Sequence, residues 1–342
     1  MPESPRPEDS EGTGRPSRPA CGEQCSCPRA NGASNDLDTL LATPGFSGSL
    51  LGSDVAGVAA QLPSLEQVVG VTVAGPVLMN DVGIHELPVG IGGPIRCRPS
   101  RISLRLNPVR LGSALVTDPA AHVPPTLRLF DAAGNTAHAT YLTETSDRLA
   151  FESLSLNAGG FDSTPAAPRV IGGTAEATAW HEQLAGDRDT PPADDQIAQF
   201  DAVLEDGGTL RLRSMPGRRG EGFARVESRR VVAAFEHAAL LGMPMTIATA
   251  APGCLQMRHD RLDSAREHRG SMVIASGTCR AMINFDLVTE CWVTWTDGVW
   301  GRTGSIELYD RHARCSLIAT QTGSVSAETF DAWNQLVADV AW

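Results

Sequence analysis

The chain contains the run Leu127-Arg-Leu-Phe-Asp-Ala-Ala-Gly-Asn135 and, later, the similar run Ile306-Glu-Leu-Tyr-Asp-Arg-His-Ala-Arg314. Each run is followed by the start of an aromatic-bearing helix, near Phe151 in the first case and near Trp333 in the second. The runs lie about 180 residues apart, roughly half the chain, which is too long an interval for a solenoid. The self-match therefore predicts two tandem copies of one domain.

The composition is that of a soluble globular protein. A length of 342 residues is enough for two domains, each able to bury its own core. The net charge of -12 argues against nucleic acid and anionic membranes as partners, because both favour a basic face. All 28 residues counted as Lys or Arg are Arg, which excludes a P-loop Lys, a Schiff-base Lys and a Lys general base.

The sequence is not expected to direct export or membrane insertion. The N-terminal residues combine prolines and charges and lack the apolar core of a signal peptide. The most apolar stretch, from 231 to 251, is interrupted by Glu236 and Pro244 and is not expected to span a bilayer. Without an export signal, the eight Cys are expected to be free thiols and the protein to be cytoplasmic.

The first 45 residues are predicted to be a disordered tail. They are rich in Pro, Gly, Ser and charged residues and offer little apolar surface to offset the entropy of ordering. Cys21, Cys25 and Cys27 lie within this tail. Three Cys without a fourth ligand nearby are a weak zinc pattern, so incidental cysteines are favoured over a metal site.

Hydrophobic patterning predicts similar elements in both halves. Residues 101–106 alternate, with Ile102, Leu104 and Leu106 on one face of a strand. Hairpins are predicted over 126–142 and 304–320, and helices over 146–154, with Ser146 as cap, and from Ser326 onward. A helix near 226–241 and further strands over 246–250, 254–257, 271–275, 280–285 and 290–295 complete the second half.

These elements predict an α+β fold made by tandem duplication of a domain with a large antiparallel sheet and flanking helices. A segment rich in Gly and Pro separates the two halves. The predicted organisation is a tail over 1–45, a first repeat over 46–157, a connection over 158–200 and a second repeat over 201–342.

Several runs in both halves resemble the haem-utilisation family typified by HemS, ChuS and HmuS, with its ChuX-like single-domain relatives. In chain order the runs are 83–86, 103–106, 127–151, 252–256, 306–310 and Trp333. The resemblance implies two repeated domains and a cytosolic protein that receives haem after uptake. It also implies a haem cleft between the first repeat and the connection.

The same resemblance implies a function and a set of partners. The expected function is that of a haem-binding protein of haem uptake and iron acquisition, either a haem carrier or a haem-degrading factor. Enzymatic activity therefore stays open. The expected partners are haem and a haem-uptake transporter or an electron donor. The charge and the lack of a long apolar stretch, given above, predict no nucleic acid and no membrane insertion.

A haem site requires apolar walls, an axial donor such as His, and Arg or backbone donors for the propionates. Arg105 matches the distal Arg of the family, and the alternation of its strand directs it away from the apolar face of Ile102 and Leu104. The alternative is an ordinary solvated Arg on a strand.

The iron ligand of the family lies in a Trp-x5-6-Asp-x-His-x-Phe motif within the connection. Trp180 matches the Trp, but Pro191 falls at the position of the His, and His181 is the nearest imidazole. His181 is therefore the candidate iron ligand, with an exposed His beside a packed Trp as the alternative. His85, followed by Glu86, is a second candidate haem contact, with a structural hydrogen bond as the alternative.

The second repeat departs further from the family, because residues 321–325 carry no charge where the family is basic. His259, His268 and His312 are predicted to be surface residues. No nucleophile elbow, HExxH motif or Walker A motif is present. Two hypotheses follow: a haem-binding protein, or a diverged scaffold that has lost haem and serves as an interaction or small-ligand protein.

Overall fold

The computed structural model describes residues 35–342 apart from 53, 121–122, 159–194, 219–222 and 324. Residues Asn35–Trp342 cluster as one compact unit. The helices are α1 (Asp36–Leu41), α2 (Val55–Ala60), α3 (Arg148–Ala158), α5 (Gln196–Asp206), α6 (Thr209–Ser214), α7 (Ser228–Leu240) and α8 (Ala327–Ala341).

The strands of the first half are β1 (Gly48–Leu51), β2 (Glu66–Ala74), β3 (Val77–His85), β4 (Val89–Gly90), β5 (Arg101–Leu106), β6 (Leu111–Thr117), β7 (Thr126–Asp131) and β8 (Thr136–Ser146). Those of the second half are β9 (Ala224–Val226), β10 (Pro244–Ala251), β11 (Cys254–Arg261), β12 (Ser264–His268), β13 (Ser271–Ser276), β14 (Cys279–Ile283), β15 (Val288–Gly298), β16 (Gly301–Asp310) and β17 (Cys315–Thr320).

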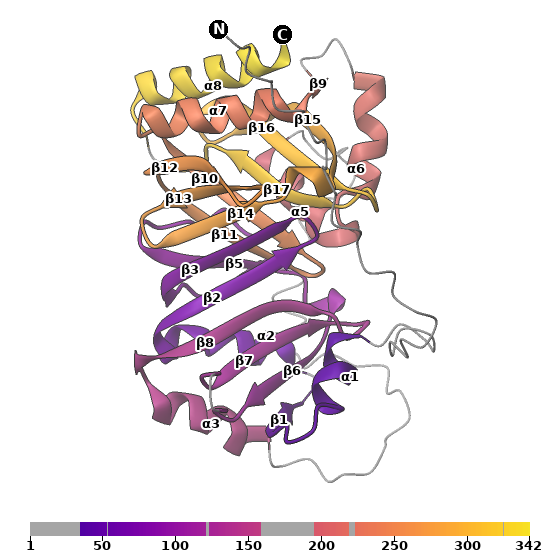
Figure 1. The fold of residues 1–342 in the computed structure, drawn as a ribbon, viewed down its shortest axis with the longest axis vertical. Helices are drawn as coiled ribbons and strands as arrows, with labels where there is room; N and C mark the ends of the chain where they lie inside the picture. Colours follow the sequence, from indigo (N-terminus) through magenta and orange to yellow (C-terminus); the bar gives the residue numbers. More distant parts are fainter. Residues whose placement is uncertain (1–34, 53, 121–122, 159–194, 219–222, 324) are drawn as a thin grey trace, which may run out of the picture. The chain divides into compact units, whose positions relative to one another are not determined.

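The strands form two sheets that are antiparallel except at two parallel contacts of β5, with β3 and with β4 (Figure 1). The first sheet has the order β1-β6-β7-β8-β2-β3-β14-β13-β12. The second sheet has the order β9-β15-β16-β17-β10-β11-β5-β4. Each sheet therefore contains strands from both halves of the chain.

The pairing confirms the predicted duplication. In both halves the register shifts at the same place of the repeated hairpin, between Leu129 and Phe130 and between Leu308 and Tyr309. The strands β2, β3, β5, β6, β7 and β8 match β10, β11, β14, β15, β16 and β17 in order and in pairing. The fold is α+β, with two copies of an antiparallel sheet flanked by helices.

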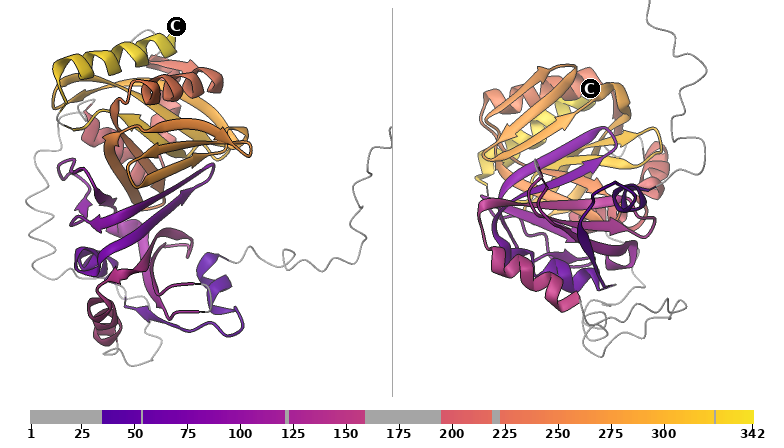
Figure 2. Two further views of the ribbon diagram at one scale, coloured as in Figure 1. Left: turned by 60° about the vertical axis from the view of Figure 1, so that its left-hand side comes forward. Right: turned by 60° about the horizontal axis from the view of Figure 1, so that its bottom comes forward.

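The two copies exchange one strand each. Strand β14 of the second copy pairs with β3 of the first, and β5 of the first pairs with β11 of the second. The registers are equivalent, because Val77 faces Ile283 while Cys254 faces Leu106. Figure 2 shows the purple strands of the first half lying against the orange strands of the second. The exchange makes the two copies parts of one folded unit.

Three apolar clusters hold the helices on the sheets. One cluster joins α2 and α3 to the first copy, and a second joins α7 and α8 to the second copy. A third cluster packs α5 and α6 on the opposite face of the second sheet, through Phe200, Leu204 and Leu212. The second sheet is therefore covered on both faces.

Some local predictions need correction. The cap of α3 is Asp147 rather than Ser146, because the Asp147 carboxylate accepts a hydrogen bond from the Ala150 amide at 2.9 Å. His259 is buried rather than on the surface, and its Nδ1 lies 2.9 Å from the Thr246 hydroxyl. Helix α1 lies near the end of the range predicted as a tail, and α5 crosses the predicted boundary at 200. The domain boundaries themselves stay predictions.

Candidate functional site

Arg105 on β5 is completely buried and ion-paired. Its Nε and Nη2 atoms each lie 2.6 Å from Oδ1 of Asp201, and its Nη1 donates to the Gly93 carbonyl at 2.8 Å. The side chain is 0 % exposed, so it is not an ordinary solvated Arg on a strand. It leaves β5 opposite the apolar face of Ile102 and Leu104, as the strand alternation predicts.

Asp201 comes from α5 and links three parts of the chain. One carboxylate oxygen pairs with Arg105, and the other accepts a hydrogen bond from the Gly92 amide at 2.8 Å. Burial raises the pKa of the Asp201 carboxyl, and the charge of Arg105 opposes that rise. The guanidinium is thus paired with a residue of α5. Among the described residues, Arg105 does not line any of four pockets found on the surface.

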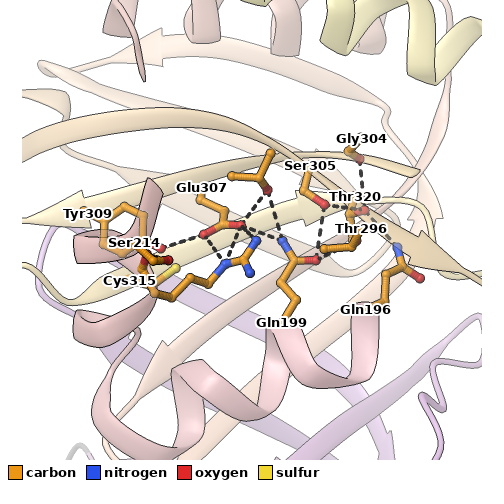
Figure 3. A network of polar contacts seen from close by, with 12 residues as sticks. Gln196, Gln199, Ser214, Thr296, Gly304, Ser305, Glu307, Tyr309, Cys315 and Thr320 are labelled. Atoms are coloured by element: carbon orange, nitrogen blue, oxygen red, sulfur yellow. Dashed lines mark hydrogen bonds and ion pairs between the residues drawn. The ribbon is translucent and has the colours of Figure 1, made fainter. Parts of the chain in front are cut away.

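A buried carboxylate, Glu307 on β16, fixes α5 and α6 to the same face of the second sheet (Figure 3). Glu307 pairs with Arg211 of α6 at 2.7 Å and accepts from Gln199 of α5 at 2.6 Å. The hydroxyls of Thr294 and Tyr309 also donate to it, each at 2.6 Å. Burial alone would raise the pKa of the Glu307 carboxyl, but Arg211 and the hydrogen bonds lower it below its ordinary value.

Further hydrogen bonds extend this network along α5. The side chain of Gln196 donates to the Thr320 hydroxyl at 3.1 Å and to the Gln321 carbonyl at 2.7 Å. Ser305 donates to Thr320 at 2.9 Å (Figure 3). These hydrogen bonds pair the buried polar groups of α5 with the second sheet. Helix α5 therefore lies on the face of that sheet toward which Arg105 points.

His85 lies at the end of β3 and belongs to a different environment. Its Nε2 atom is 3.2 Å from the Thr140 hydroxyl, and its ring meets that of His138 edge to face with centroids 5.3 Å apart. The side chain is 1 % exposed, and Nδ1 has no hydrogen-bond partner among the described residues. Burial, and then His138, lower the pKa of His85 well below its ordinary value, so the imidazole is neutral at pH 7.

Glu86 does not orient His85. Its Oε2 accepts a hydrogen bond from Ser103 at 2.6 Å, and its Oε1 lies 3.4 Å from Nε of Arg98. A small pocket of about 260 Å³ is lined by His85, Glu86, Leu87, Arg96, Arg98 and Arg101. Glu86 therefore lines this pocket, while Thr140 contacts the ring of His85.

The structure separates the predicted site residues. Arg105 packs beneath α5, whereas His85 faces the core of the first copy beside Ile102. His181 and the three tail cysteines lie outside the described residues. Within the described part of the chain, no group of three His, Cys, Asp or Glu side chains could hold a metal ion.

Sequence reasoning missed Asp201, Arg211 and Glu307. Glu307 carries a detectable signal, because it lies between two apolar residues in the repeated strand and takes the place of Arg128 in the first copy. Asp201 carries no such signal, since its partner on β5 is 96 residues away. Its role follows only from the tertiary structure.

Comparison with solved structures finds proteins of the same architecture. Apo-PhuS, a haem-binding protein from Pseudomonas aeruginosa, superimposes with a TM-score of 0.66 and 18 % identity over 89 % of each chain. ChuS, an E. coli haem oxygenase, gives a TM-score of 0.67 and 17 % identity over 86 % of this chain and 89 % of its own. Both similarities span most of each chain.

The sequence comparisons add no further relative. No protein-family model matches the chain, and no curated protein matches it in sequence. No helix in the described ranges combines the length and apolarity needed to cross a bilayer. The predicted resemblance is therefore confirmed at the level of the fold, and this chain has the duplicated α+β fold of PhuS and ChuS.

Proposed function

We propose that this protein binds haem and acts in haem uptake and iron acquisition, as a carrier or as a haem-degrading factor. The observation that supports this most is the shared fold, which extends over 89 % of the chain and of the haem-binding protein PhuS. Arg105 adds support, because a buried guanidinium stands on the strand that the family resemblance selected.

The described residues around Arg105 do not fit haem as they are arranged. The guanidinium is bound by Asp201 and Gly93, and the apolar residues beside it pack against α5. The proposed iron ligand, His181, lies outside the described residues. Haem binding at this face therefore requires Asp201 to release Arg105 and α5 to leave part of the sheet.

Titration of haemin into the pure protein tests the proposal. We expect a saturable shift of the Soret band with one-to-one stoichiometry, weakened at least tenfold in Arg105→Ala and in His181→Ala. Arg266→Ala and His268→Ala are matched controls, because both side chains are exposed on β12. Spectra of free haemin at every ratio would reject haem binding.

A second function is favoured by the Arg105–Asp201 pair itself. A buried guanidinium that is ion-paired with an internal carboxylate is typical of a structural ion pair. In this alternative the protein is a diverged scaffold that has lost haem and acts as an interaction or small-ligand protein. It predicts that haemin spectra are the same in the wild type and in Arg105→Ala.

A further inference from the structure

We propose that the pocket at the end of β3 binds a small anion, either a carboxylate or a phosphate group. His85, Arg96, Arg98 and Arg101 line it, together with Glu86 and Leu87. The pocket is separate from Arg105 and from the face covered by α5. The inference does not rest on haem binding.

The charges around the pocket are unbalanced. Three arginines and one carboxylate, that of Glu86, line the pocket, and this carboxylate is already engaged by Ser103 and Arg98. Among the described residues, the side chains of Arg96 and Arg101 have neither an ion pair nor a hydrogen bond. Both guanidinium groups are therefore available for an anion. Guanidinium groups bind carboxylates and phosphates in a bidentate manner.

His85 also lines the pocket, and it carries a buried polar atom without a partner in the described part of the chain. His85 is 1 % exposed, and its Nδ1 has no partner among the described residues. Buried polar atoms are rarely left unpaired, because the loss of hydration is costly. If the Thr140 hydroxyl donates to Nε2, the neutral ring carries its proton on Nδ1.

The size of the pocket restricts the ligand. A volume of about 260 Å³ is below the range of about 300–1,000 Å³ that is typical of pockets for drug-sized molecules. The pocket therefore accepts one acidic group and not a porphyrin ring. That group comes either from a small free anion or from the carboxylate edge of a larger ligand that stays outside.

Calorimetric titration with inorganic phosphate and with acetate, at constant ionic strength, tests the site. We expect saturable one-to-one binding of at least one of the two anions, weakened at least tenfold in the double variant Arg96→Gln/Arg101→Gln. Arg266→Gln is the matched control and should bind like the wild type. Absence of saturable binding, or equal binding by the double variant, would overturn the proposal.

A spectroscopic measurement on the wild type avoids variants of the buried histidine. Addition of the anion should shift the imidazole ¹⁵N resonances of His85 and leave those of the exposed His268 unchanged. Unchanged His85 resonances at saturation would contradict the assignment. A parallel haemin titration identifies the source: weakened haemin binding in the double variant indicates the carboxylate of a porphyrin, and unchanged haemin binding indicates a free anion. A protein that binds phosphate but no haemin would reject the proposed function and keep this site.

Discussion

Asp81 and Arg258 occupy equivalent positions in the two copies, 177 residues apart, and form a buried ion pair with each other. Nη1 of Arg258 lies 3.1 Å from Oδ2 of Asp81, and Nη2 lies 2.7 Å from Asp260. The pair lies on β3 and β11, the two strands that accept the exchanged strands β14 and β5. The duplication has therefore placed opposite charges at positions that face each other.

Removal of one member of this pair should destabilise the whole fold. We expect Asp81→Asn to lower the free energy of unfolding by about 1.5–3 kcal/mol, because Arg258 loses its fully buried partner and keeps only Asp260, whose side chain is 29 % exposed. Urea denaturation measures the change. The exposed pair Arg229–Glu227 is the control, and its removal should cost at most about 1 kcal/mol. Equal losses at the two pairs would contradict the assigned role of Asp81.

Glu307→Gln should release α5 and α6 from the second sheet. The substitution removes the charge that pairs with Arg211 and weakens the bonds from Gln199 and Tyr309. Amide hydrogen exchange in α6 should become faster in this variant than in Glu236→Gln, whose side chain is exposed on α7. Unchanged protection of α6 would show that apolar contacts alone hold the helix.

The same carboxylate gives a pH dependence. The pKa of Glu307 is lowered in the folded state, so the group adds stability above its unfolded pKa of about 4.3. That contribution is lost as the pH falls through the folded value. The free energy of unfolding of Glu307→Gln should therefore change less with pH below about 4.3 than that of the wild type. Parallel curves for the two proteins would contradict the lowered pKa.

The buried imidazoles should make the fold sensitive to mild acid. Burial lowers the pKa of His138 to about 3, and burial with His138 lowers that of His85. Below about pH 6.5 these histidines bind protons in the unfolded chain but not in the folded chain. Each of them therefore lowers the free energy of unfolding by up to about 1.4 kcal/mol for every unit by which the pH falls. Between pH 7.5 and 5.5, denaturation should show a smaller loss of unfolding free energy for His138→Gln than for the wild type. The variant His268→Gln, at an exposed site, should lose as much as the wild type.

Local sequence patterns predicted much of the fold but little of the candidate site. The repeated hairpins were predictable because the turns at Asp131–Asn135 and Asp310–Arg314 use local hydrogen bonds. The exchange of β5 and β14 was not, because it depends on pairing between distant segments. Likewise, the alternation on β5 gave the direction of Arg105, but no local rule links it to Asp201 on a helix 96 residues later.

The most direct test of haem binding at Arg105 is the haemin affinity of Asp201→Asn compared with wild type and Arg105→Ala. Loss of the carboxylate charge weakens the hold on the guanidinium while the side chain keeps its size. Haem binding at this face predicts that Asp201→Asn binds haemin several-fold more tightly than the wild type, and Arg105→Ala at least tenfold more weakly. Equal haemin affinities in all three proteins, or spectra of free haemin throughout, would contradict it.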